Sequence, residues 1–165
     1  MKQEGSQLDL SGTGFCASLN FRRTARAVTQ LYDAALQESG IRSTQFAILV
    51  AIAKNQPVAI GALAEVLILD ATTLTRSLQL LKKEGLIRIS DRERMRQRFL
   101  TLTPKGVKRL GRSLPMWRKA HEQFVATVGR SYWLDLRNEL EKLAHVAVEL
   151  EGPPKDTPAD APAHA

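Results

Sequence analysis

Four arginines occupy alternate positions in one short stretch of the sequence, at Arg92, Arg94, Arg96 and Arg98. In an extended chain every second side chain points to the same side, so this spacing could form a row of cations. Guanidinium groups suit phosphate because their planar donors can form two hydrogen bonds at once. We therefore expect Arg92, Arg94 and Arg96 to contact a nucleic-acid backbone or minor groove, with a solvated loop as the alternative. Arg98 lies on the same side of the extended chain as Leu100 and Leu102, and it is expected to brace the base of this segment.

Basic side chains are concentrated around this stretch. The 165 residues contain 24 Lys and Arg against 17 Asp and Glu, which gives a formal net charge of +7. Residues 71–112 alone contain twelve of the basic side chains and three of the acidic ones. Because one quarter of the chain carries more than the whole net charge, we expect a polyanionic partner for this region.

The segment DATTLTRSLQLLKKEG, residues 70–85, has the pattern of an amphipathic helix. Asp70 can cap its first turn and Gly85 can end it. Its apolar stripe consists of Leu74, Leu78 and Leu81. Polar side chains fall on or near the opposite face, at Thr72, Thr73, Arg76 and Gln79. Short hydroxyl side chains and an arginine at the front of a helix are suited to reading bases or phosphates in the major groove, although solvated helix positions look the same.

Two further helices are predicted ahead of this segment. The apolar periodicity over Phe15–Glu38 indicates a long helix that stops at Ser39 and Gly40. STQFAILVAIAK, residues 43–54, indicates a short apolar helix with a Ser/Thr start available for capping. A third segment, IGALAEVLIL at residues 60–69, directly precedes the segment 70–85, and about three residues would join the two short helices. The pair forms a candidate helix-turn-helix.

Two strands follow, because Leu86–Ser90 and Arg98–Thr103 alternate and are rich in β-branched or aromatic residues. The arginines thus lie on the tip and rising limb of a β-hairpin. Pro104 can begin a long helix to about Val128, bent or interrupted at Pro115.

The last predicted helix, Ser131–Glu149, carries apolar residues at alternating spacings of three and four, which is a heptad seam. The seam could pack on the same chain, but we favour a second subunit because a small core cannot cover three long amphipathic helices. The residues expected at a dimer interface are Leu19, Trp133, Leu136, Leu140, Leu143 and Ala147.

Several classes of protein are disfavoured by the sequence. Cys16 is the single cysteine, which excludes an internal disulfide and a cysteine zinc site. The N-terminus lacks the layout of a secretory signal, and no apolar run approaches the roughly 20 residues that span a bilayer. Residues 1–14 and 152–165 resemble flexible tails. We expect a cytoplasmic protein with no enzymatic activity, no cofactor and no metal.

In this order, the STQFAIL helix, the helix-turn-helix, EGLIRISD, the arginine-rich hairpin and LTLTPKG closely resemble the MarR family of winged-helix transcriptional regulators. The resemblance covers about Phe15 to Leu150 and is most specific from Leu63 to Gly106. It implies a mainly α fold with a small β-hairpin wing (α+β). The winged helix-turn-helix would span residues 41–104, flanked by helical dimerisation regions at 15–40 and 105–151.

The resemblance also implies a homodimer that binds a palindromic operator in double-stranded DNA, which we expect to act as a repressor. By position, Thr72, Thr73 and Arg76 lie at the front of the recognition helix, and Arg92, Arg94 and Arg96 lie on the wing. Ser43 and Thr44 begin a helix whose N-terminus commonly meets phosphate. Family wings usually hold an acidic residue where this chain has Arg94. The resemblance therefore implies a less rigid wing here, offset by the extra attraction of Arg94 for phosphate.

Many family members release DNA when a small aromatic compound enters a crevice beside the dimerisation helices. Trp117, His121 and Tyr132 could line such a crevice, although packing in a core or interface is the better explanation for them. Cys16 lies where the peroxide-sensing branch of the family has its reactive cysteine, which gives a second hypothesis. A third is a winged-helix module for protein interaction without DNA binding.

Overall fold

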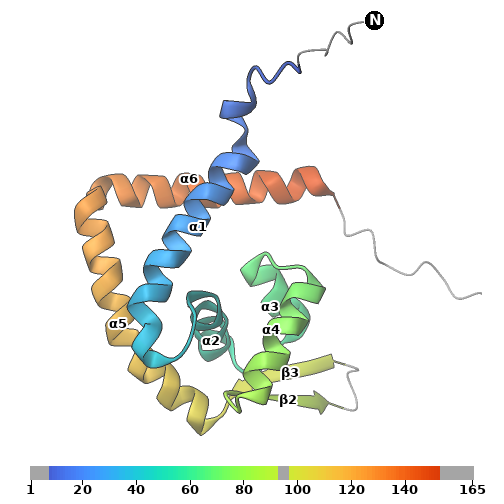
Figure 1. The fold of residues 1–165 in the computed structure, drawn as a ribbon. Helices are drawn as coiled ribbons and strands as arrows, with labels where there is room; N and C mark the ends of the chain where they lie inside the picture. The colour runs from blue at the N-terminus through green and yellow to red at the C-terminus, as the bar shows by residue number, and fades with distance from the viewer. Residues whose placement is uncertain (1–7, 93–96, 153–165) are drawn as a thin grey trace, which may run out of the picture. The chain divides into compact units, whose positions relative to one another are not determined.

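The computed structural model of the protein describes residues 8–92 and 97–152. The chain divides into two compact units, one up to Ala120 and one from His121 onward, so that the boundary falls inside a helix. Figure 1 shows the fold, with the six α-helices and the strands β2 and β3 labelled.

The first unit begins with a short 3-10 helix at Thr13–Phe15, followed by α1 at Ala17–Leu36 and a second 3-10 turn at Gln37–Ser39. Gly40 then adopts φ 73°, which a glycine tolerates without strain and which stops the helix as expected. The predicted start at Phe15 was wrong, because Cys16 is the N-cap of α1 and Phe15 lies outside it with a 93% exposed side chain.

Three helices follow, α2 at Ser43–Asn55, α3 at Ile60–Leu67 and α4 at Ala71–Lys83. The predicted helix-turn-helix is formed by α3 and α4. Ile68 ends α3 in the left-handed region with φ 50° and ψ 50°, and Leu69 N donates to Ala64 O at 3.0 Å. Only glycine, and occasionally Asn or Asp, visits this region routinely, so a β-branched residue here strains the backbone.

We expect Ile68→Gly to stabilise the protein. Relief of the left-handed strain should stabilise the folded protein by about 1–2 kcal/mol. The greater freedom of glycine in the unfolded chain should reduce this gain by about 0.5–1 kcal/mol. The Ile68 side chain is 59% exposed, so little burial is lost. Urea unfolding measures the change. Val66→Gly is the matched control because Val66 is equally exposed but lies inside α3, and it should cost roughly 1 kcal/mol. Loss of stability in Ile68→Gly would contradict the interpretation.

The wing is a three-stranded antiparallel sheet rather than the two-stranded hairpin that the sequence predicts. Its strands are β1 at Val58–Ala59, β2 at Ile87–Arg92 and β3 at Gln97–Leu102, in the order β1-β3-β2. Val58 pairs with Leu100, and Ile89 pairs with Leu100 from the other side. The sequence pattern could not reveal β1, because two residues are too few to show alternation.

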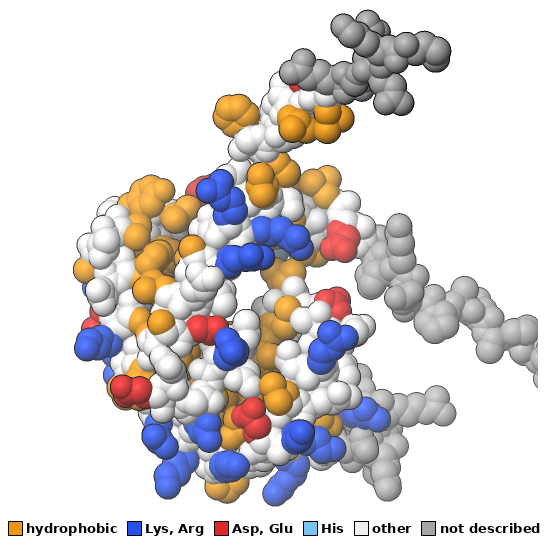
Figure 2. Space-filling model, in the orientation of Figure 1, with side chains coloured by type: hydrophobic (Ala, Val, Ile, Leu, Met, Phe, Trp, Pro, Cys, Tyr) orange, Lys and Arg blue, Asp and Glu red, His pale blue; other side chains and the backbone are white. Residues whose placement is uncertain are grey.

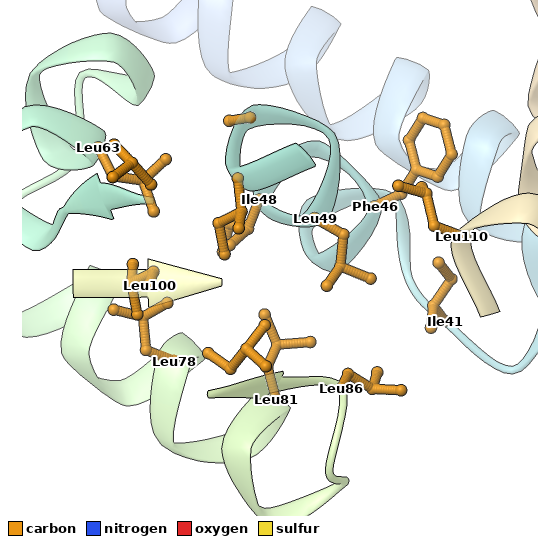
Figure 3. Packing of buried hydrophobic residues seen from close by; sticks show 14 of the residues in the cluster. Ile41, Phe46, Ile48, Leu49, Leu63, Leu78, Leu81, Leu86, Leu100 and Leu110 are labelled. Carbon is orange, nitrogen blue, oxygen red and sulfur yellow. The ribbon is translucent and has the colours of Figure 1, made fainter. Parts of the chain in front are cut away.

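Leucine and isoleucine side chains from α2, α3, α4 and the sheet converge on one core, as Figure 3 shows. The predicted stripe of α4 is confirmed, since Leu74, Leu78 and Leu81 are at most 2% exposed. The core also includes Leu49, Leu63, Leu86 and Leu100, each fully buried. This packing fixes which face of α4 remains outside.

The helix α5, Pro104–Val128, is fastened to the base of the wing by its first turn. Thr103 N donates to Leu86 O at 3.0 Å, and Thr103 Oγ1 donates to Gly85 O at 2.7 Å. Gly106 N in turn donates to Thr103 Oγ1 at 3.0 Å. The segments KKEGL and LTPKG therefore meet in space, which ties the end of α4 to the start of α5. Of the two outcomes expected at Pro115, an interruption is wrong because α5 continues through it, and a bend stays a prediction.

The second unit contains the end of α5 and α6 at Arg130–Glu151. Trp133 packs edge-on against Phe124 and His121, with ring centroids 5.5 Å and 6.2 Å apart. No residue of α6 is buried. Leu140 and Leu143 of the predicted seam are 37% and 48% exposed, and Leu150 beyond it is 84% exposed.

Candidate nucleic-acid interface

The outward face of α4 carries a group of polar side chains around a shallow hollow. Asp70 Oδ1 accepts a hydrogen bond from Thr73 N at 2.8 Å, so the expected N-cap is confirmed and the first turn is closed. Four residues line the hollow beside Ala71, namely Thr72, Thr75, Arg76 and Gln79. All four are exposed. They offer hydroxyl, guanidinium and amide groups along one side of a single helix.

Thr73 and Thr75 of α4 are both exposed but differ in whether they line the hollow. Thr73, which was grouped with Thr72, is exposed but does not line the hollow. Thr75, which was not singled out, does line it. The signal was present, since Thr75 is three residues beyond Thr72 and one turn before Gln79. A leucine stripe by itself does not distinguish the two sides of the polar face opposite it.

The expected wing arginines fall largely outside the described residues. Arg94 and Arg96 lie in the gap between residues 92 and 97, and of Arg92 the structure gives only the backbone, which pairs with Gln97 at the end of β2. Arg98 pairs with Asp91 without a bulge and lines a hollow beside Glu65 of α3. Arg98 is exposed there, and its expected role in bracing the hairpin base stays a prediction.

Exposed cations surround these elements. Figure 2 shows Lys and Arg side chains gathered along the lower edge of the face in view, over α4, β2 and the start of α5. The exposed basic residues of these elements are Arg76, Lys82, Lys83, Arg88, Lys105, Lys108 and Arg112. The surface is suited to a polyanion that reaches α4.

The N-terminus of α2 already holds an anion from the same chain. Asp33 of α1 accepts hydrogen bonds from Ser43 N at 2.7 Å and from Arg42 Nη1 at 3.3 Å. The Ser/Thr cap expected here was wrong, because Arg42 N donates instead to Gln45 Oε1 at 2.8 Å. Thr44 is exposed next to this contact. A DNA phosphate at Ser43 would share its place with a carboxylate, so phosphate contact at these two residues stays a prediction.

The hydrogen-bonded carboxylates of Asp33 and Asp70 predict how the stability of the protein changes with pH. Partial burial raises the pKa of Asp33, but its hydrogen bonds from Ser43 and Arg42 outweigh that effect and hold the pKa below its ordinary value. Hydrogen bonding with Thr73 likewise lowers the pKa of Asp70. A pKa depressed in the folded state stabilises the protein above the unfolded value of about 3.9, and this stability is lost as the pH falls through the folded value.

We therefore expect the free energy of unfolding to fall on acidification below about pH 4. Asp33→Asn and Asp70→Asn should flatten that fall, since each removes one proton-binding site whose pKa differs between the two states. Urea titrations between pH 7 and pH 2.5 measure this. Identical pH profiles in the variants and the parent protein would contradict it.

An apolar cavity of about 530 Å³ lies between α1, α2, α3 and the Trp117 side chain of α5. Phe46 and Trp117 stack in its wall with ring centroids 5.8 Å apart. Tyr32 also lines it, and burial raises the pKa of its hydroxyl. Of the three residues expected in a ligand crevice, Trp117 lines this cavity whereas His121 and Tyr132 do not.

Three candidate residues, His121, Tyr132 and Cys16, lie outside the polar row of α4 and the apolar cavity. His121 packs against Trp133, and Tyr132 is 61% exposed. Cys16 is an exposed free thiol at the N-cap of α1. Within residues 8–92 and 97–152, no group of His, Cys, Asp or Glu side chains is arranged to hold a metal ion. In those same residues, no helix combines the length and hydropathy needed to cross a membrane.

Comparisons with known proteins agree with this geometry. The profile of the MarR family matches residues 39–97. The DNA complex of the transcriptional regulator MosR of Mycobacterium tuberculosis superposes with a TM-score of 0.76 at 33% identity, covering 82% of this chain and 98% of that one. No curated protein matches the sequence.

Two more distant structures share the fold. PcaV of Streptomyces coelicolor in complex with its natural ligand has a TM-score of 0.73 at 20% identity, covering 86% of this chain and 99% of PcaV. The MepR–DNA complex of Staphylococcus aureus has a TM-score of 0.69 at 19% identity, covering 79% of this chain and 98% of MepR. At such identities the likeness concerns the fold alone.

Proposed function

Because the chain belongs to the MarR family of DNA-binding transcriptional regulators, we propose that it acts as a homodimeric repressor on a palindromic operator and is released by a small aromatic effector. The observation that carries this proposal is the outer face of α4. Thr72, Thr75, Arg76 and Gln79 form one exposed polar row on a helix whose opposite side is locked into the core. A helix held in this way can enter a major groove and present its donors to base edges.

The homodimer is supported by apolar side chains that the chain leaves uncovered. In the first half of α1, Leu19 and Phe21 are 47% and 44% exposed, and Phe15 ahead of it is almost fully exposed. In α6, Leu134, Leu143 and Val146 are each about half exposed. Large exposed apolar surfaces on soluble proteins mark interaction sites. A second copy would cover these helices and would set two α4 helices at a fixed separation.

The effector is supported by the cavity beside α1 and α2. A volume of about 530 Å³ with an almost entirely apolar lining is suited to one small aromatic molecule. Phe46 and Trp117 can stack on such a ring, and the Tyr32 hydroxyl can give it a polar partner. The relative MosR was solved with DNA, and PcaV, which shares the fold, was solved with its ligand.

Sedimentation and DNA titration test the proposal together. The purified protein should sediment as a dimer and bind duplex DNA with an affinity whose logarithm falls linearly with the logarithm of the salt concentration. The slope should be about −0.9 for each phosphate contacted, so a dimer that contacts several phosphates gives a steep line. A monomer, or a protein that does not bind duplex DNA at physiological ionic strength, would reject the proposal.

The wing contributes a separate expectation. Arg94→Ala should weaken binding about equally to every sequence, because a phosphate contact carries no base information. The salt slope should become shallower by about 0.9 for each phosphate that the variant leaves unbound, or about 2 for a dimer in which each copy releases one phosphate. Fluorescence anisotropy at several salt concentrations measures both effects. An unchanged slope would remove Arg94 from the DNA interface.

A further inference from the structure

Asp33 makes a contact that joins α1, which belongs to the expected dimerisation region, to α2 of the winged helix-turn-helix. It belongs to α1, and its carboxylate accepts the hydrogen bond of Ser43 N, the first residue of α2, at 2.7 Å. Arg42 Nη1 completes the contact at 3.3 Å. The Asp33 side chain is only 24% exposed, so water competes weakly for it. A carboxylate at the positive end of a helix fixes the position of that helix end.

From this contact a series of hydrogen bonds continues to the end of α4. Arg42 N donates to Gln45 Oε1 at 2.8 Å, which closes the first turn of α2. Gln45 Nε2 donates to Glu84 Oε1 at 3.5 Å, and Glu84 is the residue that directly follows α4. The carbonyl oxygen of Glu84 accepts from Lys105 Nζ at 2.8 Å. The first turn of α2 is therefore hydrogen-bonded on one side to α1 and on the other to the end of α4.

The same turn separates two hollows. Thr44 lines the apolar cavity and also a groove of about 650 Å³ on the other side of the turn. Asp33 lines that groove from α1, and Ser77 and Leu80 line it from α4. The distance between α1 and α4 across the groove thus depends on where the first turn of α2 is held.

We propose that Asp33 is a positioning residue for operator recognition, which holds the first turn of α2 and, through Gln45 and Glu84, sets the place of α4 without itself touching DNA. The inference rests on the proposed DNA-binding role of α4. A competing role for the same carboxylate would be repulsion of the DNA phosphates near Ser43. The two roles differ in sign, because loss of positioning weakens operator binding whereas loss of repulsion strengthens binding to every duplex.

The test compares Asp33→Ala with Asp33→Asn, which keeps an oxygen that can accept the Ser43 hydrogen bond. The measured quantity is the ratio of affinities for a selected operator duplex and for a scrambled duplex of equal length. We expect this ratio to fall about tenfold or more in Asp33→Ala, the equivalent of removing one hydrogen bond to a charged group, and to be largely restored in Asp33→Asn. Glu38→Ala is the control, because it removes an exposed carboxylate nearby and should leave the ratio unchanged.

A double-mutant cycle with Gln45→Ala tests the series of hydrogen bonds. If the two residues act through the same turn, the double variant should lose less than the sum of the single losses. If Asp33→Ala does not fold, Gln45→Ala alone tests the proposal, because it must also lower the ratio of operator affinity to scrambled-duplex affinity. The proposal is overturned if the folded variants keep the parent's ratio, or if both Asp33 variants bind all duplexes more tightly. A parent protein that shows no preference for any duplex would instead reject the proposed function.

Discussion

Gly106→Ala is expected to lower the free energy of unfolding by about 3 kcal/mol, because α5 starts against the backbone of the wing with no room for a side chain. A Cβ on Gly106 would overlap the carbonyl oxygen of Leu86 and lie 3.0 Å from its carbonyl carbon. These are backbone atoms, which cannot rotate away as a flexible side chain would. The Leu86 oxygen also accepts the hydrogen bond of Thr103 N, so any shift disturbs the joint between β2 and α5.

For a chain of this size, a loss of about 3 kcal/mol corresponds to a Tm lowered by roughly 6–12 °C, which calorimetry can measure. Gly111→Ala is the matched control in the same helix, since a Cβ there meets no atom within 4 Å. It should instead raise stability by about 0.5–1 kcal/mol through the greater helix propensity of alanine. Equal effects of the two substitutions would show that the close approach at Gly106 does not matter to the fold.

Arg76→Ala is expected to reduce operator affinity by about 1–3 kcal/mol for each half-site. Arg76 lies in the exposed polar row of α4, and its guanidinium group can pair with the two acceptors of a guanine edge. If it does so, the loss should fall on one base pair of each half-site, and duplexes already changed at that position should be bound equally by parent and variant.

Lys119→Ala is the control for the loss of one positive charge, because Lys119 is exposed on α5 and does not line the hollow beside the polar row of α4. It should alter operator affinity only slightly and without sequence preference. Titrations against the operator and its single-position variants distinguish a base contact of Arg76 from a phosphate contact. If Arg76→Ala weakens binding equally on all sequences, then Arg76 contacts phosphate and another residue of α4 specifies the base.

The helices were predictable because their signals are local and repeated. The leucine stripe of α4, its Asp70 cap and its glycine stop all agree with one helix, and the structure confirms each of them. The strand β1 was not predictable, since Val58 and Ala59 become a strand only by pairing with Leu100 and Phe99, some 40 residues away. A tertiary contact of this kind leaves no periodic trace in a two-residue segment.

The candidate site was predictable in outline and less so in detail. Thr72, Arg76 and Gln79 do lie together on the outer face of α4, where Thr75 joins them. The role of Asp33 left no signal, because nothing in the sequence of α1 indicates that one of its carboxylates reaches the start of α2. Helix N-termini often bind anions, and the sequence could not tell whether that anion would be a phosphate or a side chain.

The most direct measurement is selection of bound duplexes from a random pool by the purified protein at physiological ionic strength. Two α4 helices held by one homodimer should enrich an inverted repeat whose half-site centres are about one turn of DNA, or about 10 base pairs, apart. Recovery of an unrelated mixture of sequences, or of a single half-site without its inverted partner, would contradict a dimeric, sequence-specific DNA-binding regulator.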